Sequence, residues 1–429
     1  MFEYKNVLIV GSGGREHALG WKISKNKNIK KIFYANGNGG TYNNVQIPPN
    51  EIEKLLNFAK ENKCFTIVGP EIPLSLGIVD LFNLYDVPIF GPTKNASMLE
   101  TSKKYSKNFM KQNLIPTTEF QTFSDSSKAV DYIHKIDHDA VIKADGLASG
   151  KGVYVTTSKQ EAVTAIDLLL NAKKFGTSSQ NIIIEKRIIG EEVSIIAICD
   201  GKSFLILEPC RDHKRIFNDD KGPNTGGMGS YSPVPGIKEE EIHQISKKVF
   251  EPTIRGMIDN GNPFKGFLYA GLIIEKETRK PYVLEFNVRM GDPECQSLMM
   301  RMESDLFEYI KSTEQQSIDS IKPIEWKKRH SVCVIMASKG YPDNYEIGHI
   351  VKGIDSVDRG EDLMLFHSGT KKNSMNEIVT DGGRVFGVTS LGNTLKEAIT
   401  KSYKNVEKIK MGDNQQYYRT DIAQKVLFT

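Results

Sequence analysis

The segment Tyr282–Arg289 has the residue types and spacing with the most specific chemistry in this sequence. Because side chains alternate along a strand, Glu285, Asn287 and Arg289 are expected to share one face. A carboxylate and an amide oxygen two residues apart suit Mg²⁺, which shares oxygen ligands with phosphates. The guanidinium beside them would stabilise a transferring phosphoryl or acyl phosphate. The opposite face is predicted to carry Leu284, Phe286 and Val288. A half-buried strand with a wet polar face explains the same pattern.

A glycine-rich segment, residues 145–152, directly follows Lys143 at the end of a predicted strand. Such a loop can close over phosphates while lysines such as Lys151 neutralise them. It is not a P-loop, because the helix and the hydroxyl after the lysine are missing. Glu185 ends another apolar strand, and Glu192 follows seven residues later. These acids would take an adenine amino group and ribose hydroxyls, although two acids near a strand end are usually surface residues.

Residues 211–236 form a long segment rich in glycine, proline, asparagine and charge. It contains Asp212 and Lys214, followed by the glycine-rich stretch Asn224–Ser230. Loops of this length inside a compact domain are usually functional or disordered. Because glycines let the backbone approach a ligand closely, we interpret the segment as a substrate-facing loop.

The amino-terminal segment Gly11–His17 follows a predicted strand and opens a helix, which is the arrangement of a phosphate cradle. A dinucleotide site would need Gly or Ala where Glu16 stands, and an acid near Asn36. A nicotinamide cofactor is therefore disfavoured, and a smaller phosphate ester is favoured. Two more strand-end loops, residues 37–41 and 69–71, are expected to converge on the same crevice. Glycine turns after strands are also common packing devices.

The composition is that of a soluble globular protein. The chain has 429 residues, 39% hydrophobic and 26% charged, with a net charge of +4, and a length of about 150 residues per domain predicts about three domains. The charge surplus is too thin to indicate nucleic-acid binding. No apolar run approaches a membrane span, and the start shows no signal peptide, so we expect a cytoplasmic protein. Five dispersed cysteines without a CxxC pair argue against a disulfide scaffold or a thiolate zinc site.

The elements that must position these residues follow from the apolar periodicity. Strands and helices alternate through the first hundred residues, which predicts a doubly wound parallel sheet. The helix after the first strand is expected over 17–25, and another over 100–113, where Thr101 or Ser102 would cap it. Residues 312–329 are interpreted as a charged linker. Further predicted strands and helices lie at 126–135, 140–143, 152–155, 160–171, 182–185, 192–199, 203–207, 238–260, 266–274, 281–288, 331–336, 363–367, 384–389 and 394–408.

Several longer motifs carry a resemblance that covers nearly the whole chain. The sequence resembles the ATP-grasp ligases and, among them, the glycinamide ribonucleotide synthetase (phosphoribosylamine–glycine ligase) family. The motifs are GSGGREHAL (11–19), VGPE-PL (68–74), FGP (90–92), IKADGLASGKGV (142–153), DHKR (212–215), GPNTGGMGSYSP (222–233), GFLYAGL (266–272) and LEFNVRMGDPE (284–294).

The resemblance implies three domains. They would be a Rossmann-like substrate-phosphate domain at 1–102, an ATP-grasp domain at 103–325 with a mobile lid at about 119–190, and a small α+β domain at 326–429. It implies the ligation of glycine to 5-phosphoribosylamine with ATP, giving glycinamide ribonucleotide, ADP and phosphate through a glycyl phosphate. This is the second step of de novo purine biosynthesis, towards IMP. No protein nucleophile is needed, because positioning and charge neutralisation suffice.

The resemblance also implies the roles of individual residues, with Mg²⁺ or Mn²⁺ as the metal. Glu285 and Asn287 would hold this metal. Arg289, Lys143 and Asp212 would be catalytic. The ATP site would comprise Lys103, Lys143, Gly150, Lys151, Gly152, Glu185 and the backbone of Ile188 at the adenine, and Glu192 at the ribose. The two substrates would lie among Gly11, Gly13, Gly14, Arg15, Glu16, Gly39, Gly40, Thr41, Pro70, Glu71, Asp212, Lys214, Arg289 and Asp292.

Some residues leave alternatives open. Lys103 shares a helix face with Lys107 and Lys111, so a solvated stripe of lysines explains it equally well. Many ATP-grasp relatives carry another acidic ligand where this chain has residues 270–272, Ala-Gly-Leu, so a second ion would rely on phosphates and water. Cys295 is expected to be a packing variant close enough to the site to make thiol modification worth testing.

Other functions compete with the one that the resemblance implies. Within the fold, an ATP-grasp carboxylase or a formate-using ligase would need bicarbonate or formate. A nicotinamide-dependent oxidoreductase would use the first domain, and a silent regulator would bind ATP without releasing phosphate. We expect small-molecule substrates, no nucleic acid and no membrane, a monomer or weak oligomer, and at most a transient contact with the amidotransferase that supplies the amine.

Overall fold

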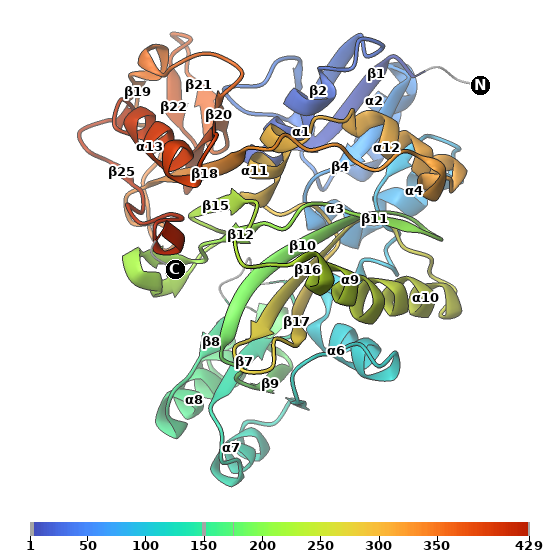
Figure 1. The fold of residues 1–429 in the computed structure, drawn as a ribbon, viewed down its shortest axis with the longest axis vertical. Helices are drawn as coiled ribbons and strands as arrows, with labels where there is room; N and C mark the ends of the chain where they lie inside the picture. Colours follow the sequence, from blue (N-terminus) through green and yellow to red (C-terminus); the bar gives the residue numbers. More distant parts are fainter. Residues whose placement is uncertain (1–3, 148–151, 175, 428–429) are drawn as a thin grey trace.

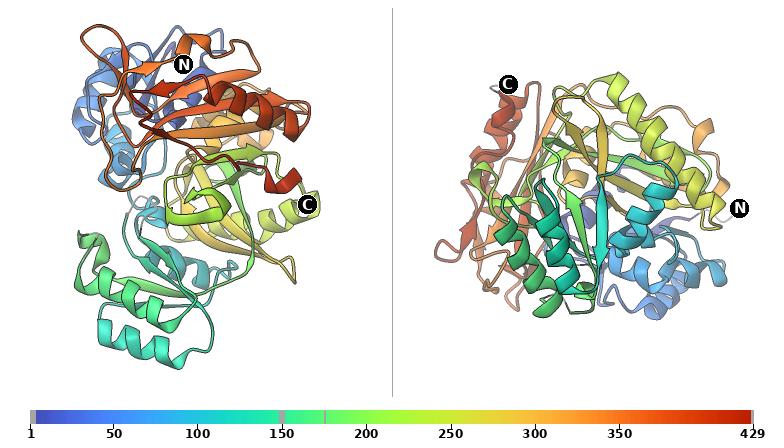
Figure 2. Two further views of the ribbon diagram at one scale, coloured as in Figure 1. Left: turned by 90° about the vertical axis from the view of Figure 1, so that its left-hand side faces the viewer. Right: turned by 90° about the horizontal axis from the view of Figure 1, so that it is seen from below.

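The computed structural model describes residues 4–147, 152–174 and 176–427. The chain folds into an amino-terminal parallel sheet, a central region with two antiparallel sheets, and a carboxyl-terminal sheet (Figures 1 and 2). The multidomain α/β and α+β architecture predicted from the sequence is confirmed.

The amino-terminal sheet is fully parallel, as predicted, with the order β3-β2-β1-β4-β5. Its central strand is apolar and buried, because helices connect successive strands. The first helix begins at Gly14 and not at residue 17, since Gly13 is extended and the Glu16 side chain accepts its N–H. The elements are β1 (Asn6–Gly11), α1 (Gly14–Ile23), β2 (Lys31–Asn36), β3 (Asn44–Val45), α2 (Ile52–Glu61), β4 (Cys64–Val68), α3 (Glu71–Leu76), α4 (Ile78–Leu84) and β5 (Ile89–Phe90).

The helix predicted over 100–113 is two helices, α5 (Met98–Thr101) and α6 (Lys103–Gln112). The chain is extended at Ser102, with φ −133° and ψ 110°, and the Ser102 hydroxyl accepts the Tyr105 N–H. This N-cap lets a new helix begin in a different direction. The break places Lys103 in the first turn of α6.

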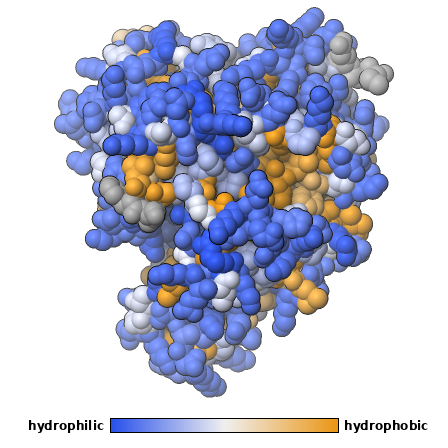
Figure 3. Space-filling view, in the orientation of Figure 1, coloured by the Kyte–Doolittle hydropathy of each residue, from blue (hydrophilic) through white to orange (hydrophobic). Residues whose placement is uncertain are grey.

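The segment predicted to be a lid, about residues 119–190 and called the lid below, forms a separate antiparallel sheet of order β6-β9-β7-β8 with its own apolar core. It projects from one end of the molecule (Figures 1 and 2), and its visible surface is mostly hydrophilic (Figure 3). The strand β6 at the edge of this sheet was not predicted from the sequence. The elements are β6 (Phe120–Phe123), α7 (Ser126–Lys135), β7 (Ala140–Ala144), β8 (Val153–Val155), α8 (Lys159–Ile166), a π turn at Asp167–Asn171, a 3₁₀ turn at Gly176–Ser179, and β9 (Ile182–Lys186).

The second central sheet has the order β11-β10-β16-β17 and carries the predicted metal strand at its edge. One long helical stretch, interrupted by a π turn at Ser246–Phe250, lies beside it in Figure 1. The elements are β10 (Gly190–Asp200), β11 (Phe204–Ile206), α9 (Glu239–Ile245), α10 (Glu251–Asp259), β16 (Lys265–Glu275) and β17 (Pro281–Asn287).

The interpretation of 211–236 as a loop is wrong for much of its length. Within it, β12 (Arg211–Asp212) and β15 (Gly229–Ser232) form one edge of the carboxyl-terminal sheet. Ser230 pairs with Cys333, so backbone hydrogen bonds tie the segment to distant strands that sequence periodicity cannot reveal. Between them lie β13 (Arg215–Phe217), a 3₁₀ turn at Asn218–Asp220, and β14 (Lys221–Asn224).

The carboxyl-terminal sheet runs β12-β15-β18-β23-β20, with β25 also paired to β18, and α13 packs on it. Short strand pairs and 3₁₀ turns complete this region. The elements are β18 (His330–Ser338), β19 (Val351–Lys352), a 3₁₀ turn at Ile354–Ser356, β20 (Leu363–His367), β21 (Thr370–Lys372), β22 (Ile378–Thr380), β23 (Arg384–Gly392), α13 (Leu395–Val406), β24 (Lys410–Met411), β25 (Gln416–Tyr417) and a 3₁₀ turn at Lys425–Leu427.

The predicted linker 312–329 is packed against the body. Ile318 is fully buried, and the Tyr309 hydroxyl donates to the carbonyl of Lys322 at 3.0 Å. Helix α11, which the sequence did not reveal, packs against α1 on one side and β18 on the other, so it joins the two terminal regions. The elements are α11 (Glu294–Arg301), α12 (Leu306–Ser312) and 3₁₀ turns at Thr313–Gln315 and Ile318–Ser320. Among the described residues, no helix is long and apolar enough to cross a membrane.

Candidate functional site

Strand β17 places Glu285 and Asn287 at the edge of its sheet, with both side chains partly exposed. A bulge opposite Gly271 and Leu272 interrupts the regular pairing. Leu284 therefore remains half-exposed, whereas Phe286 and Val288 are buried, and the predicted apolar face is wrong for Leu284. A bulge shifts the alternation of side chains by one residue.

Arg289 lies just beyond β17 and is held by two carboxylates. Its Nη2 donates to Glu100 Oε1 at 2.9 Å, and its Nε lies 3.4 Å from Glu71 Oε2. Glu100 also accepts the backbone N–H of Val288 at 2.7 Å. Burial opposes the charge of Arg289, but the two carboxylates outweigh it and raise the pKa of the guanidinium. Its Nη2 is also 3.5 Å from Asn287 Oδ1, which places the arginine beside the predicted metal ligands.

Glu100 is a residue of the site that the sequence did not single out. Its carboxyl group is buried, and burial raises its pKa. It stands at the end of the short helix α5, far from Arg289 in sequence. The only hint of its role in the sequence is its position two residues before the helix cap Ser102. That position does not indicate a functional residue, because such spacing is common at helix starts.

The lid contributes a buried charge cluster centred on Glu185. Lys107 Nζ lies 2.9 Å from Glu185 Oε2 and Lys143 Nζ lies 2.8 Å from Oε1, while the Thr118 hydroxyl donates to Oε2 at 2.7 Å. Burial raises the pKa of Glu185, but the two ammonium groups lower it to about 2. The carboxylate is therefore ionised; its Oε2 accepts two hydrogen bonds, whereas Oε1 has, within the residues described, only the ion pair with Lys143. Lys143 also donates to the carbonyl of Leu284 at 3.1 Å, which links the lid to β17.

The lysines of α6 do not form a solvated stripe. Lys107 is 2% exposed, whereas Lys111 is exposed. Lys103 is half-buried, and its Nζ donates to the carbonyl of Gly146 at 3.2 Å, at the start of the glycine-rich segment. Gly150 and Lys151 lie outside the described residues, and the Gly152 carbonyl accepts the Ala144 N–H at 2.9 Å.

Glu192 and Lys214 face Glu285 across the strand surface. Lys214 Nζ is 3.5 Å from Glu192 Oε2 and 3.6 Å from Glu285 Oε1. Burial raises the pKa of Glu285, but Lys214, Lys143 and Lys103 together lower it, so the carboxylate is ionised. Ile188 is half-buried in the connection from the lid to β10.

Asp212 is brought to the same region by β12, which pairs with β15. Burial raises the pKa of its carboxyl group to about 8, and the nearby acids Glu294 and Glu192 add to the shift while Lys214 opposes it. Burial therefore favours the protonated form of the Asp212 carboxyl group.

The amino-terminal glycine loop encloses Glu16. The Gly13 N–H donates to Glu16 Oε2 at 2.6 Å, and Arg15 Nε lies 2.5 Å from Oε1. A Cβ on Gly11, which has φ +125°, would overlap the Glu16 side chain, as would a Cβ on Gly69. Glu16 thus fills the space that a dinucleotide fingerprint keeps open for close helix–strand packing.

Asp292 lies beside the same loop. A Cβ on Gly13 would come within 3.1 Å of Asp292 Oδ2, and one on Gly14 within 3.7 Å of Oδ1. Arg384 Nη2 lies 3.4 Å from Oδ2, and the Arg384 guanidinium also donates to the carbonyl of Gly226 at 2.6 Å. Burial raises the pKa of Asp292, but Arg384 and Arg15 lower it. Arg384, which the sequence did not indicate, therefore connects the substrate loops to the carboxyl-terminal sheet.

The second glycine loop packs against the carboxyl-terminal region. The Gly39 N–H donates to Thr370 O at 2.9 Å, and a Cβ on Gly40 would overlap the His367 ring. The Thr41 hydroxyl is within 2.7 Å of Asn44 Oδ1. Residues of the carboxyl-terminal region therefore hold this loop in place, and the sequence of the first domain alone cannot predict those contacts. Pro70 is the N-cap of α3, and Glu71 opens that helix beside Arg289.

Cys295 does not offer a reactive thiol. Its side chain is fully buried, and burial raises its pKa well above the usual value. Its Sγ contacts the carbonyl of Arg15 at 3.7 Å. The burial agrees with the expected packing role and disfavours thiol modification, because a thiol must be ionised and accessible to react.

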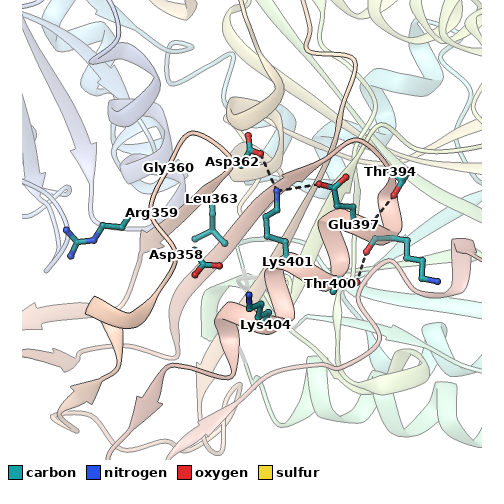
Figure 4. A pocket seen from close by; sticks show the side chains of 11 residues that line it. Asp358, Arg359, Gly360, Asp362, Leu363, Thr394, Glu397, Thr400, Lys401 and Lys404 are labelled. Atoms are coloured by element: carbon teal, nitrogen blue, oxygen red, sulfur yellow. Dashed lines mark hydrogen bonds and ion pairs between the residues drawn. The ribbon is translucent and has the colours of Figure 1, made fainter.

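A cavity of about 600 Å³ lies away from these residues, between α13 and residues 358–363, which lead into β20 (Figure 4). Three of its charged side chains pair with one another: Lys401 Nζ is 3.2 Å from Asp362 Oδ2 and 3.7 Å from Glu397 Oε1. The cavity brings together no predicted site residue, so the candidate site is the region around β17.

Comparison with known proteins assigns the amino-terminal, central and carboxyl-terminal parts of the chain to the same family. The family models of phosphoribosylglycinamide synthetase match residues 5–100 (N domain), 101–295 (ATP-grasp (A) domain) and 331–425 (C domain). The phosphoribosylamine–glycine ligase of Rhodopirellula baltica is 43% identical over 99% of this chain and 98% of its own length. That of Vibrio vulnificus is 44% identical over 98% of each.

Solved structures agree with these sequence matches. The crystal structure of phosphoribosylamine–glycine ligase from Thermotoga maritima has a TM-score of 0.82 and 33% identity, covering 97% of this chain and all of the other. A biotin carboxylase from Campylobacter jejuni has a TM-score of 0.72 at 14% identity, covering 99% of each chain, which shows a shared fold alone. The chain therefore belongs to the phosphoribosylglycinamide synthetase family, the ATP-grasp phosphoribosylamine–glycine ligases, as its motifs indicated.

Proposed function

We propose that the residues around β17 bind ATP and a divalent ion and join glycine to 5-phosphoribosylamine, giving glycinamide ribonucleotide, ADP and phosphate. The observation that supports this site is the convergence of three cationic side chains on one strand. Lys143 contacts the Leu284 carbonyl, Lys214 is 3.6 Å from Glu285, and Arg289 is 3.5 Å from Asn287. Cationic side chains that converge on one strand suit a triphosphate and a carboxylate substrate.

In this proposal, ATP lies between the lid and β17. Lys103 and Lys143 bind its phosphates, and the glycine-rich segment closes over them. The segment around Ile188 contacts the adenine and Glu192 contacts the ribose. The Glu185 carboxylate is already bound by two lysines, so it would share those bonds with the adenine amino group. Gly150 and Lys151 are assigned to the ATP phosphates, as predicted from the resemblance.

Glu285 and Asn287 fit Mg²⁺ or Mn²⁺. Both offer oxygen atoms, and the pKa of Glu285 is lowered, so its carboxylate is available. Among the described residues, no group of three or more His, Cys, Asp or Glu side chains forms a closed metal cage. Two oxygen ligands leave room for phosphate oxygens and water, which Mg²⁺ favours. When bound, the ion would neutralise charge on the phosphates.

Arg289 is assigned to the glycine carboxylate and to the acyl phosphate that forms from it. Glu100 and Glu71 fix the guanidinium, so its donors would be aimed before the substrate arrives. Asp212 and Lys214 lie across the strand from it and would orient the reacting groups. The first step joins the carboxylate oxygen to the γ-phosphorus and releases ADP. The amine then attacks the carbonyl carbon, releases phosphate and loses a proton.

The phosphate of phosphoribosylamine is assigned to the loops at the carboxyl ends of β1, β2 and β4. Backbone N–H groups at the start of α1 favour an anion. Gly11, Gly13 and Gly14 are assigned to this site; a Cβ on any of them would overlap Glu16 or Gln296, and Asp292 lies beside Gly13 and Gly14. The remaining residues proposed here are Arg15, Glu16, Gly39, Gly40, Thr41, Pro70 and Glu71.

Two finer parts of the proposal concern assembly and delivery. We expect the protein to act as a monomer or weak oligomer. Because phosphoribosylamine is labile, a transient contact with the amidotransferase that makes it would shorten its exposure to water.

A coupled assay of ADP release, with each component omitted in turn, tests this function. We expect turnover only when ATP, glycine, 5-phosphoribosylamine and a divalent ion are all present, and none after chelation with EDTA. Turnover that depends on bicarbonate or formate would instead assign the chain a different ATP-grasp reaction. Binding of NADH, followed by fluorescence, would contradict the proposed use of the glycine loop.

A further inference from the structure

The charge cluster beneath the lid contains two ammonium groups and one carboxylate. Lys107 and Lys143 contact different oxygens of Glu185, and all three side chains are at most 7% exposed. The next carboxylate that acts on both lysines is Glu285, which Lys214 and Lys103 also face. A buried charge without a partner is costly. The cluster therefore has room for an anionic ligand.

The two lysines of the cluster have different surroundings. Lys107 comes from α6 and donates to Thr117 Oγ1 at 2.7 Å, Thr118 Oγ1 at 3.1 Å and Glu185. An ammonium group has three hydrogens, so these acceptors satisfy it. Lys143 comes from the lid and, among the described residues, has two partners: the ion pair with Glu185 Oε1 at 2.8 Å and the Leu284 carbonyl. Within the described part of the chain, Lys143 is thus the lysine with a donor left for a ligand.

Release of Lys143 has a consequence for Glu185. If Lys143 turned to a phosphate while Glu185 had no other cation, a buried carboxylate would keep only the Thr118 hydroxyl. That cost would hold Lys143 at Glu185 and weaken nucleotide binding. Lys107 removes the cost, because its 2.9 Å contact with Glu185 does not depend on Lys143. Burial lowers the pKa of Lys107 only to about 8, so it is mostly charged at neutral pH.

We propose that Lys107 is a positioning residue that keeps the Glu185 carboxylate paired and fixed, so that Lys143 is free to bind the nucleotide phosphates. This inference rests on the proposed contact between Lys143 and ATP. It differs from a purely structural role in one respect: Lys107 matters for ATP only as long as Glu185 carries a negative charge.

Five variants of the full-length protein test the proposal by titration with ATP and Mg²⁺ in a calorimeter, alongside kcat and KM for each substrate. In Lys107→Met, Lys143 stays bound to Glu185, so we expect the Kd of ATP to rise about tenfold or more. We expect KM for glycine to change less than twofold. Lys111→Met removes an exposed lysine of the same helix and should leave every value unchanged.

The decisive comparison is Glu185→Gln against Lys107→Met/Glu185→Gln. Glutamine keeps an oxygen acceptor and removes the charge, so Lys107 should no longer matter. We expect the two proteins to bind ATP equally, within about twofold, and the double variant to bind better than Lys107→Met. A double variant that binds ATP tenfold more weakly than Glu185→Gln overturns the proposal. This comparison holds even if Lys107→Met alone fails to fold.

Lys143→Met separates this inference from the function on which it rests. If Lys143→Met binds ATP as tightly as the unmodified protein, the assignment of Lys143 to the phosphates is wrong. If Lys143→Met weakens ATP binding and Lys107→Met does not, only the role of Lys107 is wrong. Thermal denaturation of each variant checks that the lid and body remain folded.

Discussion

The lid side and the glycine-loop side of the candidate site hold their charges in different ways. On the lid side, Lys107, Lys143 and Glu185 come from distant elements and positive charge is in surplus. On the other side, the Glu16 carboxylate is bound by neighbours within its own loop, Gly13 and Arg15. A cluster with surplus charge can exchange partners with a ligand, whereas an internally paired loop is already formed. We therefore expect nucleotide binding to rearrange the first region and sugar-phosphate binding to leave the second unchanged.

The largest effect is expected at Glu285, where the surplus cations meet the predicted metal ligands. Glu285→Ala should lower kcat by about 10³-fold, because the ion loses its charged ligand. The side chain is 32% exposed, so the free energy of unfolding should change by less than about 1 kcal/mol. Steady-state kinetics and urea denaturation measure both. Glu277→Ala, at an exposed turn of the same hairpin, is the control. Unfolding of the variant, or normal turnover, would show that the metal assignment is wrong.

A smaller loss of activity is expected when one of the two carboxylates that hold Arg289 is removed. In Glu100→Gln, Arg289 loses its 2.9 Å carboxylate partner while the Glu71 contact remains. We expect kcat to fall about 10- to 100-fold with little change in KM for ATP, since the guanidinium is less well aimed. The exposed Glu53→Gln is the matched control. A KM effect confined to ATP would instead place Arg289 at the nucleotide.

The glycine loop provides the complementary test. Gly13 has an ordinary φ of −80°, so the obstacle to a side chain is space. A Cβ there would lie 2.7 Å from Glu16 Oε2. Gly13→Val should raise KM for 5-phosphoribosylamine about tenfold. KM for ATP should not change, because the lid cluster is separate. Unchanged kinetics for the sugar phosphate would place its phosphate elsewhere.

The last test concerns stability instead of catalysis, at the contact between the glycine loops and the carboxyl-terminal region. His17 Nδ1 accepts the His367 N–H at 3.0 Å, and burial lowers the pKa of His17 to about 4 and that of His367 to about 3. Below pH 6.5 the unfolded chain takes up protons that the folded protein excludes, so stability falls as pH falls. Each histidine should remove about 1.4 kcal/mol per pH unit between pH 6.5 and its folded pKa.

Urea denaturation between pH 7 and 5 measures this slope. His367→Gln should lower the slope by one proton, whereas His134→Gln, at an exposed histidine, should leave it unchanged. A slope identical in His367→Gln and the unmodified protein would mean that His367 is protonated in the folded state.

The local elements were largely predictable, and the contacts between them were not. Helix α7 and strand β20 have the predicted bounds, because turns and polar residues flank them in the sequence. The break at Ser102 was missed although the cap residue was recognised, since the same residues also suit a helix interior. The segment 211–236 was taken for a loop, because β15, the strand that joins it to the sheet, pairs with β18 about a hundred residues away.

By itself, the sequence determined the family, the parallel first domain and the strand that carries Glu285, Asn287 and Arg289, because motifs and alternation are local properties of the chain. Only the tertiary structure decided that Glu100 holds Arg289, that Lys107 is buried against Glu185, and that Arg384 reaches Asp292. These are pairs of charges from distant segments. Nothing in their spacing distinguishes a lysine on a wet helix face from one buried against a carboxylate, because burial is set by what packs on top of it.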